Sequence, residues 1–260
     1  MHDWLLAVIL GVIEGVTEFL PISSTGHLLL AEHWLKIPKS SFLSSEIFNV
    51  CIQSGAVVAV IAVFFERVKQ LATRHAEPAT RDYLLKLATA FLITAVFGLL
   101  FKKLGLKLPK DVAPIAWATF LGGVLFLVIE RWIKDRPTTN EITWAITIGI
   151  GVGQLVAATF PGASRSGMTI LFALAMGLAR PAATEFSFLL GVPTLLAAGA
   201  YEAYKGLPVD WLALAIGTLV SAATAFLVVK WLLRFIQTHT FVAFGWYRVV
   251  MGLLTLAFGR

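Results

Sequence analysis

Two stretches of this sequence share a pattern that one continuous helix cannot adopt. Residues 11–28 read GVIEGVTEFLPISSTGHL, and residues 151–168 read GVGQLVAATFPGASRSGM. In each, an apolar run of helical character reaches a proline, and a serine-rich turn follows. Proline lacks an amide donor and disfavours helical geometry in the residue before it, so both runs are predicted to break there. A shift of 140 positions places Gly11 on Gly151, Glu14 on Gln154, Pro21 on Pro161 and Ser24 on Ser164.

The composition identifies the class of protein. Of the 260 residues, 58% are hydrophobic and only 14% are charged, whereas a soluble domain carries roughly a quarter charged residues. Several apolar runs approach the ~20 residues that cross the hydrocarbon core as a helix. The chain is therefore predicted to be an all-α polytopic membrane protein. Its net charge of +6 lies in short loops, as in other membrane proteins, so no nucleic-acid partner is expected. The single cysteine, Cys51, excludes an intrachain disulfide.

Six apolar runs are predicted to cross the membrane, and each interrupted stretch is predicted to form a re-entrant helical hairpin. The spans are 47–66, 84–101, 113–133, 184–204, 211–233 and 241–259. The hairpins are 4–35 and 142–178, each broken at its proline. Non-helical backbone at membrane depth is tolerated only where protein or a wet cavity surrounds it. We therefore expect both turns to lie inside the protein.

The order of these elements predicts an inverted internal repeat. One hairpin plus three spans makes an odd number of crossings, so the second half must run through the membrane in the opposite sense to the first. Repeat 1 covers about 1–135 and repeat 2 about 141–260, within a single membrane domain of residues 1–260. Inverted repeats whose broken helices meet at the midplane are a recurrent membrane architecture.

The loops predict the orientation. The side that holds both termini carries eight Lys and Arg residues, among them Lys107, Lys110 and Arg260, and the opposite side carries eleven. Because cytoplasmic loops collect Lys and Arg, both termini are predicted to lie outside the cytoplasm.

The first interrupted stretch contains two carboxylates that hydrocarbon would reject. Glu14 and Glu18 are four residues apart, so they share one face of a helix. Ionisable groups inside membrane segments default to functional sites, and two adjacent carboxylates repel unless a cation or a proton intervenes. They are the predicted ligands of a metal ion. The structural alternative is that they pair with Arg165 and Arg248 and only stabilise the packing.

The turn after Pro21 supplies hydroxyls and an imidazole. Ser23 or Ser24 can cap the following helix, and Thr25 and Gly26 complete a turn suited to binding phosphate. Ser24 and His27 are three residues apart and can share a helix face. That spacing suits a nucleophile with an adjacent base. A capping serine followed by a histidine at the membrane interface explains this motif equally well.

The second turn has the composition of a phosphate clamp. Arg165 offers a planar donor fork that matches phosphate oxygens, and a helix that begins there adds the positive end of its dipole. Its neighbours supply further hydroxyl and amide donors: Ser164, Ser166, Gly167 and Thr169. A snorkelling arginine is the alternative, but Arg165 lies well inside an apolar region.

Three further polar residues of the predicted spans are candidates for supporting roles: Gln53, Glu185 and Arg248. Gln53 can line the site, although a hydrogen bond between helices is the simpler interpretation. Arg248 in the last span is expected to pair with a carboxylate such as Glu18 or Glu185.

Together these motifs resemble the undecaprenyl-diphosphate phosphatase family, the bacitracin-resistance type of integral membrane enzyme. The resemblance rests on EGVTEFLPISSTGH at 14–27, PGASRSGMT at 161–169 and EFSFLL at 185–190, and it covers essentially the whole chain. It implies removal of the terminal phosphate from the C55 isoprenyl diphosphate, which recycles the lipid carrier of cell-wall synthesis. It also implies a divalent cation, Mg²⁺ or Ca²⁺, and a site on the outer face of the bacterial cytoplasmic membrane. The family's glutamates, serine, histidine and arginine correspond to Glu14, Glu18, Ser24, His27 and Arg165.

The residues leave the mechanism and one rival function open. Ser24 is the preferred nucleophile, with His27 or Glu18 taking its proton, but a water activated by His27 can also attack directly. A lipid-phosphate transporter or flippase would use the same midplane anion site. The reactive groups beside that site favour the enzyme. The expected partners are the polyprenyl diphosphate, membrane lipids and, as an option, a second copy of the chain in a homodimer.

Overall fold

The structure, a computed structural model, describes residues 2–105, 111–205 and 209–258. These ranges form eleven α-helices, one 3₁₀ helix and no β-strand. The first-half helices are α1 (Asp3–Thr17), α2 (Ser24–Trp34), η1 (Phe42–Ser44), α3 (Glu46–Val63), α4 (Phe65–Thr73), α5 (Pro78–Lys103) and α6 (Val112–Ile133). The second-half helices are α7 (Trp144–Thr159), α8 (Arg165–Ala175), α9 (Arg180–Tyr204), α10 (Trp211–Phe235) and α11 (Val242–Phe258). The prediction of an all-α protein is confirmed, and only η1 and α4 were not predicted.

The helices identify a multi-pass membrane protein. Five of them, α3, α5, α6, α9 and α10, are long and apolar enough to cross a membrane. The sixth predicted span is α11, which has 17 residues; the last position of that span, residue 259, lies outside the described residues. All eight tryptophans are between 45% and 75% exposed, as side chains of an aromatic belt at the membrane interface would be.

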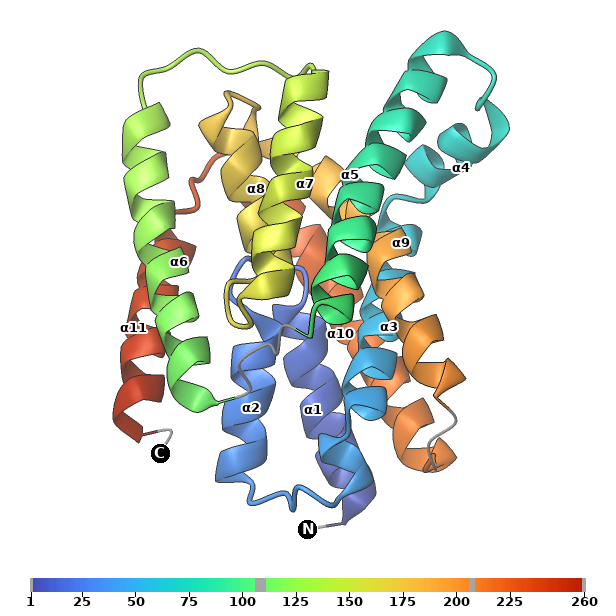
Figure 1. Cartoon of the computed structure of the whole chain (residues 1–260), viewed down its shortest axis with the longest axis vertical. Coiled ribbons are helices and arrows are strands. Elements are labelled where there is room, and N and C mark those ends of the chain that lie inside the picture. Colours follow the sequence, from blue (N-terminus) through green and yellow to red (C-terminus); the bar gives the residue numbers. More distant parts are fainter. Residues whose placement is uncertain (1, 106–110, 206–208, 259–260) are drawn as a thin grey trace.

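The two hairpins enter the molecule from opposite ends (Figure 1). The pair α1–α2 occupies the lower half and the pair α7–α8 the upper half, and their turns meet near the middle. Helix α1 packs against α10, whereas α7 packs against α5, so each hairpin leans on a helix of the other half. This reciprocal packing is what an inverted repeat requires, while the repeat boundaries stay a prediction.

The start of α1 and the end of α11 lie at one end of the bundle, and the connection from α6 to α7 lies at the other (Figure 1). This arrangement agrees with the loop assignment used to predict the orientation. Three of the basic residues in that prediction, Lys107, Lys110 and Arg260, lie outside the described residues.

Small residues bring α1 unusually close to α10. A Cβ atom on Gly11 would lie 2.6 Å from the carbonyl oxygen of Gly217, and one on Gly15 would lie 2.5 Å from that of Ser221. Glycines four residues apart allow such backbone approach between membrane helices. The approach leaves no solvent around Glu14, which lies between them in sequence and is completely buried.

The serines that cap α2 and α8 define the true register of the two turns. Ser23 and Ser164 are the N-caps, and both adopt a left-handed φ, of 75° and 71°. The predicted superposition of Ser24 on Ser164 is therefore wrong by one residue. The second turn contains an additional residue before its cap, so Ser24 corresponds to Arg165, and these are the first residues of their helices.

Candidate active site

The carboxylate of Glu18 joins the two hairpins. Its Oε2 atom accepts a hydrogen bond of 2.7 Å from Ser24 Oγ, and its Oε1 atom lies 3.3 Å from Arg165 Nη2. Glu18 directly follows α1, whereas Ser24 and Arg165 begin α2 and α8. The positive ends of two helix dipoles therefore point toward this carboxylate. Three residues that the sequence singled out are thus in direct contact.

Arg165 is held from several sides. Its Nη1 atom donates to the carbonyl oxygen of Ser187 at 3.1 Å, and its guanidinium carbon lies 5.2 Å from the centre of the Phe19 ring. Its Nε atom is buried and has no hydrogen-bond partner among the described residues. Gly191 on α9 provides the space, because a Cβ atom there would lie 2.6 Å from Nη1. The sequence analysis missed Gly191; only its place opposite Arg165 reveals its role.

Glu14 lies one helical turn before Glu18. It is fully buried, and neither of its carboxylate oxygens has a hydrogen-bond partner among the described residues. A buried carboxylate in this state needs a proton or a cation. No group of three or more His, Cys, Asp or Glu that could hold a metal ion occurs in the described ranges. Mg²⁺ is commonly held by one or two carboxylates together with substrate phosphates, so Glu14 and Glu18 fit the predicted cation.

His27 does not contact Ser24 as the spacing suggested. Its Nδ1 atom lies 2.7 Å from the carbonyl oxygen of Ser23, and its Nε2 atom lies 2.6 Å from the hydroxyl of Tyr247 on α11. The hydroxyl of Ser24 instead donates a hydrogen bond to Glu18. Of the two proton acceptors considered from the sequence, the geometry therefore favours Glu18.

Several hydroxyls predicted to bind phosphate are engaged within the protein. Ser166 Oγ lies within hydrogen-bond distance of the carbonyl oxygens of Glu18 and Leu20, at 3.3 and 3.1 Å. Thr169 Oγ1 lies 2.9 Å from the carbonyl oxygen of Arg165 in the same helix and 2.6 Å from Ser187 Oγ. These bonds fasten the second turn to the first turn and to α9.

The remaining predicted phosphate ligands lie at the helix starts. Ser23 Oγ and Ser164 Oγ accept from the amides of Gly26 and Gly167, at 3.4 and 3.1 Å. Both serines thus act as caps. The hydroxyl of Ser164 also lies 3.2 Å from Ser166 Oγ, whereas the hydroxyl proton of Ser23 stays free for a further acceptor. The side chain of Thr25 is exposed at the start of α2, where it remains open to a ligand.

Arg248 links the two turns through their backbones. It is completely buried, and it donates to the carbonyl oxygens of Pro21 at 3.1 Å, Gly162 at 3.2 Å and Ala163 at 2.9 Å. The prediction that Arg248 pairs with a carboxylate is wrong. The proline breaks leave backbone carbonyl groups that need donors, and Arg248 supplies them. A Cβ atom on Gly122 would overlap the guanidinium, so this glycine makes the room for Arg248.

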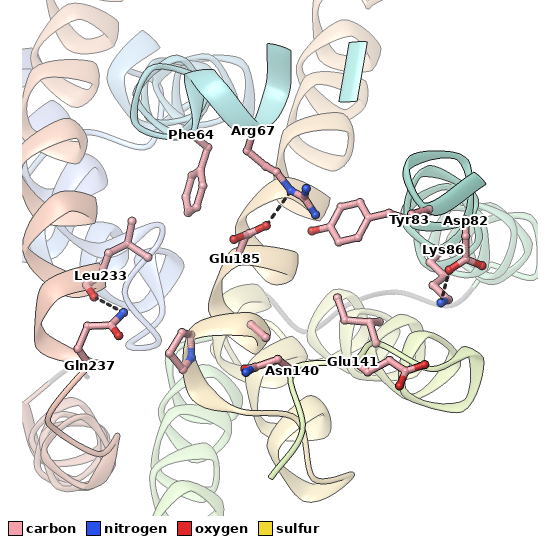
Figure 2. Close-up of a pocket in the computed structure, with 14 residues that line it drawn as sticks. Phe64, Arg67, Asp82, Tyr83, Lys86, Asn140, Glu141, Glu185, Leu233 and Gln237 are labelled. Carbon is pink, nitrogen blue, oxygen red and sulfur yellow. Dashed lines mark hydrogen bonds and ion pairs between the residues drawn. The ribbon is translucent and has the colours of Figure 1, made fainter. Parts of the chain in front are cut away.

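Glu185 lies in a different place from the other predicted residues. Figure 2 shows it accepting a hydrogen bond of 3.0 Å from Arg67 Nε, inside a cavity of about 600 Å³. This cavity is lined by residues of α4, α5, α9 and α10, and neither Glu18 nor Ser24 lines it. The structure therefore places Glu185 away from the turns, and its supporting role stays a prediction. Gln53 is half-buried on α3, and its amide bonds no other described residue.

Three phenylalanines separate this cavity from the site. Phe64 lines the cavity, and its ring centre lies 6.4 Å from that of Phe188. The Phe188 ring in turn meets the edge of Phe19 at 5.0 Å, and Phe19 lies beneath Arg165. Phe19 and Phe188 are completely buried. These three rings thus form an aromatic column between the cavity and the site.

Comparison with known proteins gives a consistent result over the whole chain. A family model described as "Bacitracin resistance protein BacA" matches residues 7–254. A Rhizobium etli protein named undecaprenyl-diphosphatase is 48% identical over 261 residues, which cover 98% of this chain and 96% of the relative. Proteins of the same name from Xylella fastidiosa and Xanthomonas axonopodis pv. citri are 46% and 45% identical, over 98% and 97% of this chain and 98% and 96% of their own.

Proposed function

Because this chain belongs to the bacitracin resistance protein BacA family, we propose that it is an undecaprenyl-diphosphatase. It removes the terminal phosphate of undecaprenyl diphosphate, recycles the lipid carrier and so confers bacitracin resistance. One observation carries the proposal: the hydroxyl of Ser24 donates to Glu18 at 2.7 Å beside the largely buried Arg165, where two helices begin. Phosphoryl transfer depends mainly on positioning and on neutralising developing charge, and this arrangement provides both.

In the proposed reaction Ser24 is the nucleophile. Its Oγ attacks the terminal phosphorus while its proton passes to Glu18, and the bond from that phosphorus to the bridging oxygen breaks. Undecaprenyl phosphate leaves with the bond electrons, and a phosphoserine remains. Water then attacks the phosphoserine, and Ser24 and inorganic phosphate are released. Arg165 stabilises the charge on the transferred phosphate, since its Nε donor has no partner within the described chain.

Glu14 and Glu18 are the residues that would hold a divalent cation, Mg²⁺ or Ca²⁺. When bound, the cation supplies positive charge to the phosphate oxygens. The two unpartnered oxygens of Glu14 support this assignment. The predicted phosphate ligands at the helix starts, Ser23, Thr25 and Ser164, would share the diphosphate with Arg165.

The protein acts in the bacterial cytoplasmic membrane, and its site opens to the outer face, the side of both termini. The larger number of Lys and Arg at the opposite end of the bundle supports this orientation. The prenyl tail stays among the membrane lipids while the diphosphate reaches the turns. Glu18, Ser24 and Arg165 come from one chain, so the proposed chemistry does not depend on the predicted homodimer.

A second candidate function is lipid-phosphate transport. It is favoured by the cavity of about 600 Å³ that ends at the aromatic column on the other side of the site. A carrier needs access from both faces, whereas a phosphatase needs it from one.

Phosphate release in detergent distinguishes the two functions, because no vectorial step can contribute there. Purified protein is given a polyprenyl diphosphate with Mg²⁺, with Ca²⁺ and with a chelator. We expect release with a cation, and its loss in Ser24→Ala. The control is Ser54→Ala, a half-buried serine of α3. Release by wild type and by Ser24→Ala at similar rates would rule out the serine nucleophile. Absence of release under every cation would instead favour the transporter.

A further inference from the structure

We infer that Arg67 is a positioning residue for Arg165, and that it acts through its ion pair with Glu185 and the first half of α9. The inference rests on the proposed phosphatase function. Arg67 lies on α4 and lines the cavity, away from the two turns. Arg67 and Glu185 are 118 positions apart in the sequence, and no local pattern connects either of them with the guanidinium of Arg165.

The first half of α9 holds the guanidinium of Arg165. The carbonyl oxygen of Ser187 accepts a hydrogen bond from Nη1 at 3.1 Å. The ring of Phe188 meets that of Phe19, whose centre lies 5.2 Å from the guanidinium carbon. Gly191 leaves the space that the guanidinium occupies. A shift or rotation of this part of α9 therefore displaces the support of Arg165.

Arg67 holds the same part of α9 from the side of the cavity. Its Nε atom donates to Glu185 Oε1 at 3.0 Å, two residues before Ser187 (Figure 2). Arg67 is itself held in place. Its Nη1 atom donates to Gln70 on its own helix at 3.0 Å, and its guanidinium carbon lies 4.5 Å from the centre of the Tyr83 ring on α5. The ion pair thus joins α9 to a side chain that α4 and α5 fix.

Aromatic contacts accompany the ion pair but do not replace it. The ring centre of Phe64 lies 6.4 Å from that of Phe188, and Tyr83 meets the buried Phe186 at 5.5 Å. Apolar burial resists the separation of two helices but has no preferred direction. A charge-assisted hydrogen bond does have one. The ion pair is therefore the contact that determines how α9 is rotated relative to α4.

A second ion pair at the far end of α9 provides a matched control. Glu46, at the start of α3, lies 3.7 Å from Lys205, which follows the last residue of α9. Pro193 lies inside α9 between this end and the contacts of Arg165. Because proline interrupts the helical hydrogen-bond ladder, a displacement at Lys205 is poorly transmitted to the first half of the helix. Loss of the Glu46 pair should therefore leave Arg165 in place.

Removal of the charges tests the inference by phosphate release in detergent. Arg67→Met and Glu185→Met each abolish the pair, and we expect kcat to fall about 10-fold with KM unchanged, because changes within a packed network alter coupling by a factor of roughly 2 to 30. Arg67→Lys keeps a cation opposite Glu185 and should recover most of the loss. Glu46→Met should keep the wild-type kcat. Thermal unfolding, measured in parallel, corrects each rate for the folded fraction.

A double-mutant comparison separates positioning of Arg165 from general support of the fold. In Gly191→Ala the guanidinium is already displaced, so the further change Arg67→Met should cause little additional loss of kcat. A full additional loss in that background would overturn the inference. So would wild-type kcat in Arg67→Met, and both results would leave the proposed function intact. If the wild-type protein releases no phosphate, the proposed function fails and takes the inference with it.

Discussion

Gly191 offers a sharp test of the proposed role of Arg165. The change Gly191→Ala places a methyl group 2.6 Å from Nη1 and 2.8 Å from Cζ of the guanidinium. Ordinary van der Waals contact begins at 3.4 Å, so Nη1 must retreat by at least 0.8 Å. The backbones of α8 and α9 are packed against each other, and the flexible arginine side chain must therefore move. Its bonds to Glu18 and to the Ser187 carbonyl lengthen as a result.

The change Gly191→Ala should lower the catalytic rate and leave the stability of the protein nearly unchanged. A misplacement of about 1 Å in a positioned group can lower a rate by about 100-fold, and we expect a loss of that order in kcat. Alanine is a better helix former than glycine by roughly 1 kcal/mol, which offsets the crowding. The matched control is Gly98→Ala on α5, where the new methyl group meets nothing within 4 Å.

The assay is phosphate release by the two variants in detergent, with thermal unfolding measured in parallel. We expect Gly98→Ala to keep wild-type turnover and Gly191→Ala to lose it at similar stability. A Gly191→Ala enzyme with a kcat close to that of Gly98→Ala would refute the reasoning. It would mean that the position of the guanidinium does not limit the reaction.

Three other changes have distinct outcomes. Arg248→Met leaves buried carbonyls of both turns without donors, so it should destabilise the protein by about 1–3 kcal/mol per orphaned group in thermal unfolding; an unchanged Tm would contradict the linking role. Glu14→Gln removes a proposed cation ligand and should raise the Mg²⁺ concentration for half-maximal activity at least about 10-fold; an unaltered cation titration would exclude Glu14. Glu130→Ala leaves Arg180 and the Phe241 amide unpaired and should lower the free energy of unfolding by about 3–5 kcal/mol. Unfolding at the wild-type temperature would contradict this role of Glu130.

The class of fold follows from the sequence alone because it depends on local properties. Apolar runs of spanning length, with most charges in loops, indicate membrane helices whatever their neighbours are. The breaks follow from the missing amide donor of Pro21 and Pro161, which no tertiary contact can restore. Both features appear in the structure within a few residues of their predicted positions. The cap of α2 shows the limit of this reasoning, since the sequence left Ser23 and Ser24 equivalent.

The sequence determined only in part which residues form the site. The sequence selected Glu18, Ser24 and Arg165 because polar groups in hydrocarbon stand out, and these three are in contact. It could not say that Glu18 would join the other two. It also left open whether His27 or Glu18 takes the proton of Ser24, and in the structure α2 turns the imidazole toward Tyr247.

The remaining contacts depend on how whole helices are rotated and shifted against one another, which no local pattern encodes. Arg248 finds backbone carbonyls instead of a carboxylate, Glu185 faces a separate cavity, and Gly191 makes room for a side chain of another helix. Each of these depends on distances between segments far apart in the chain. The two interrupted stretches were therefore recognisable from the sequence as the centre of the protein. Only the tertiary structure decided which side chains complete that centre, because packing sets the partners of a buried polar group.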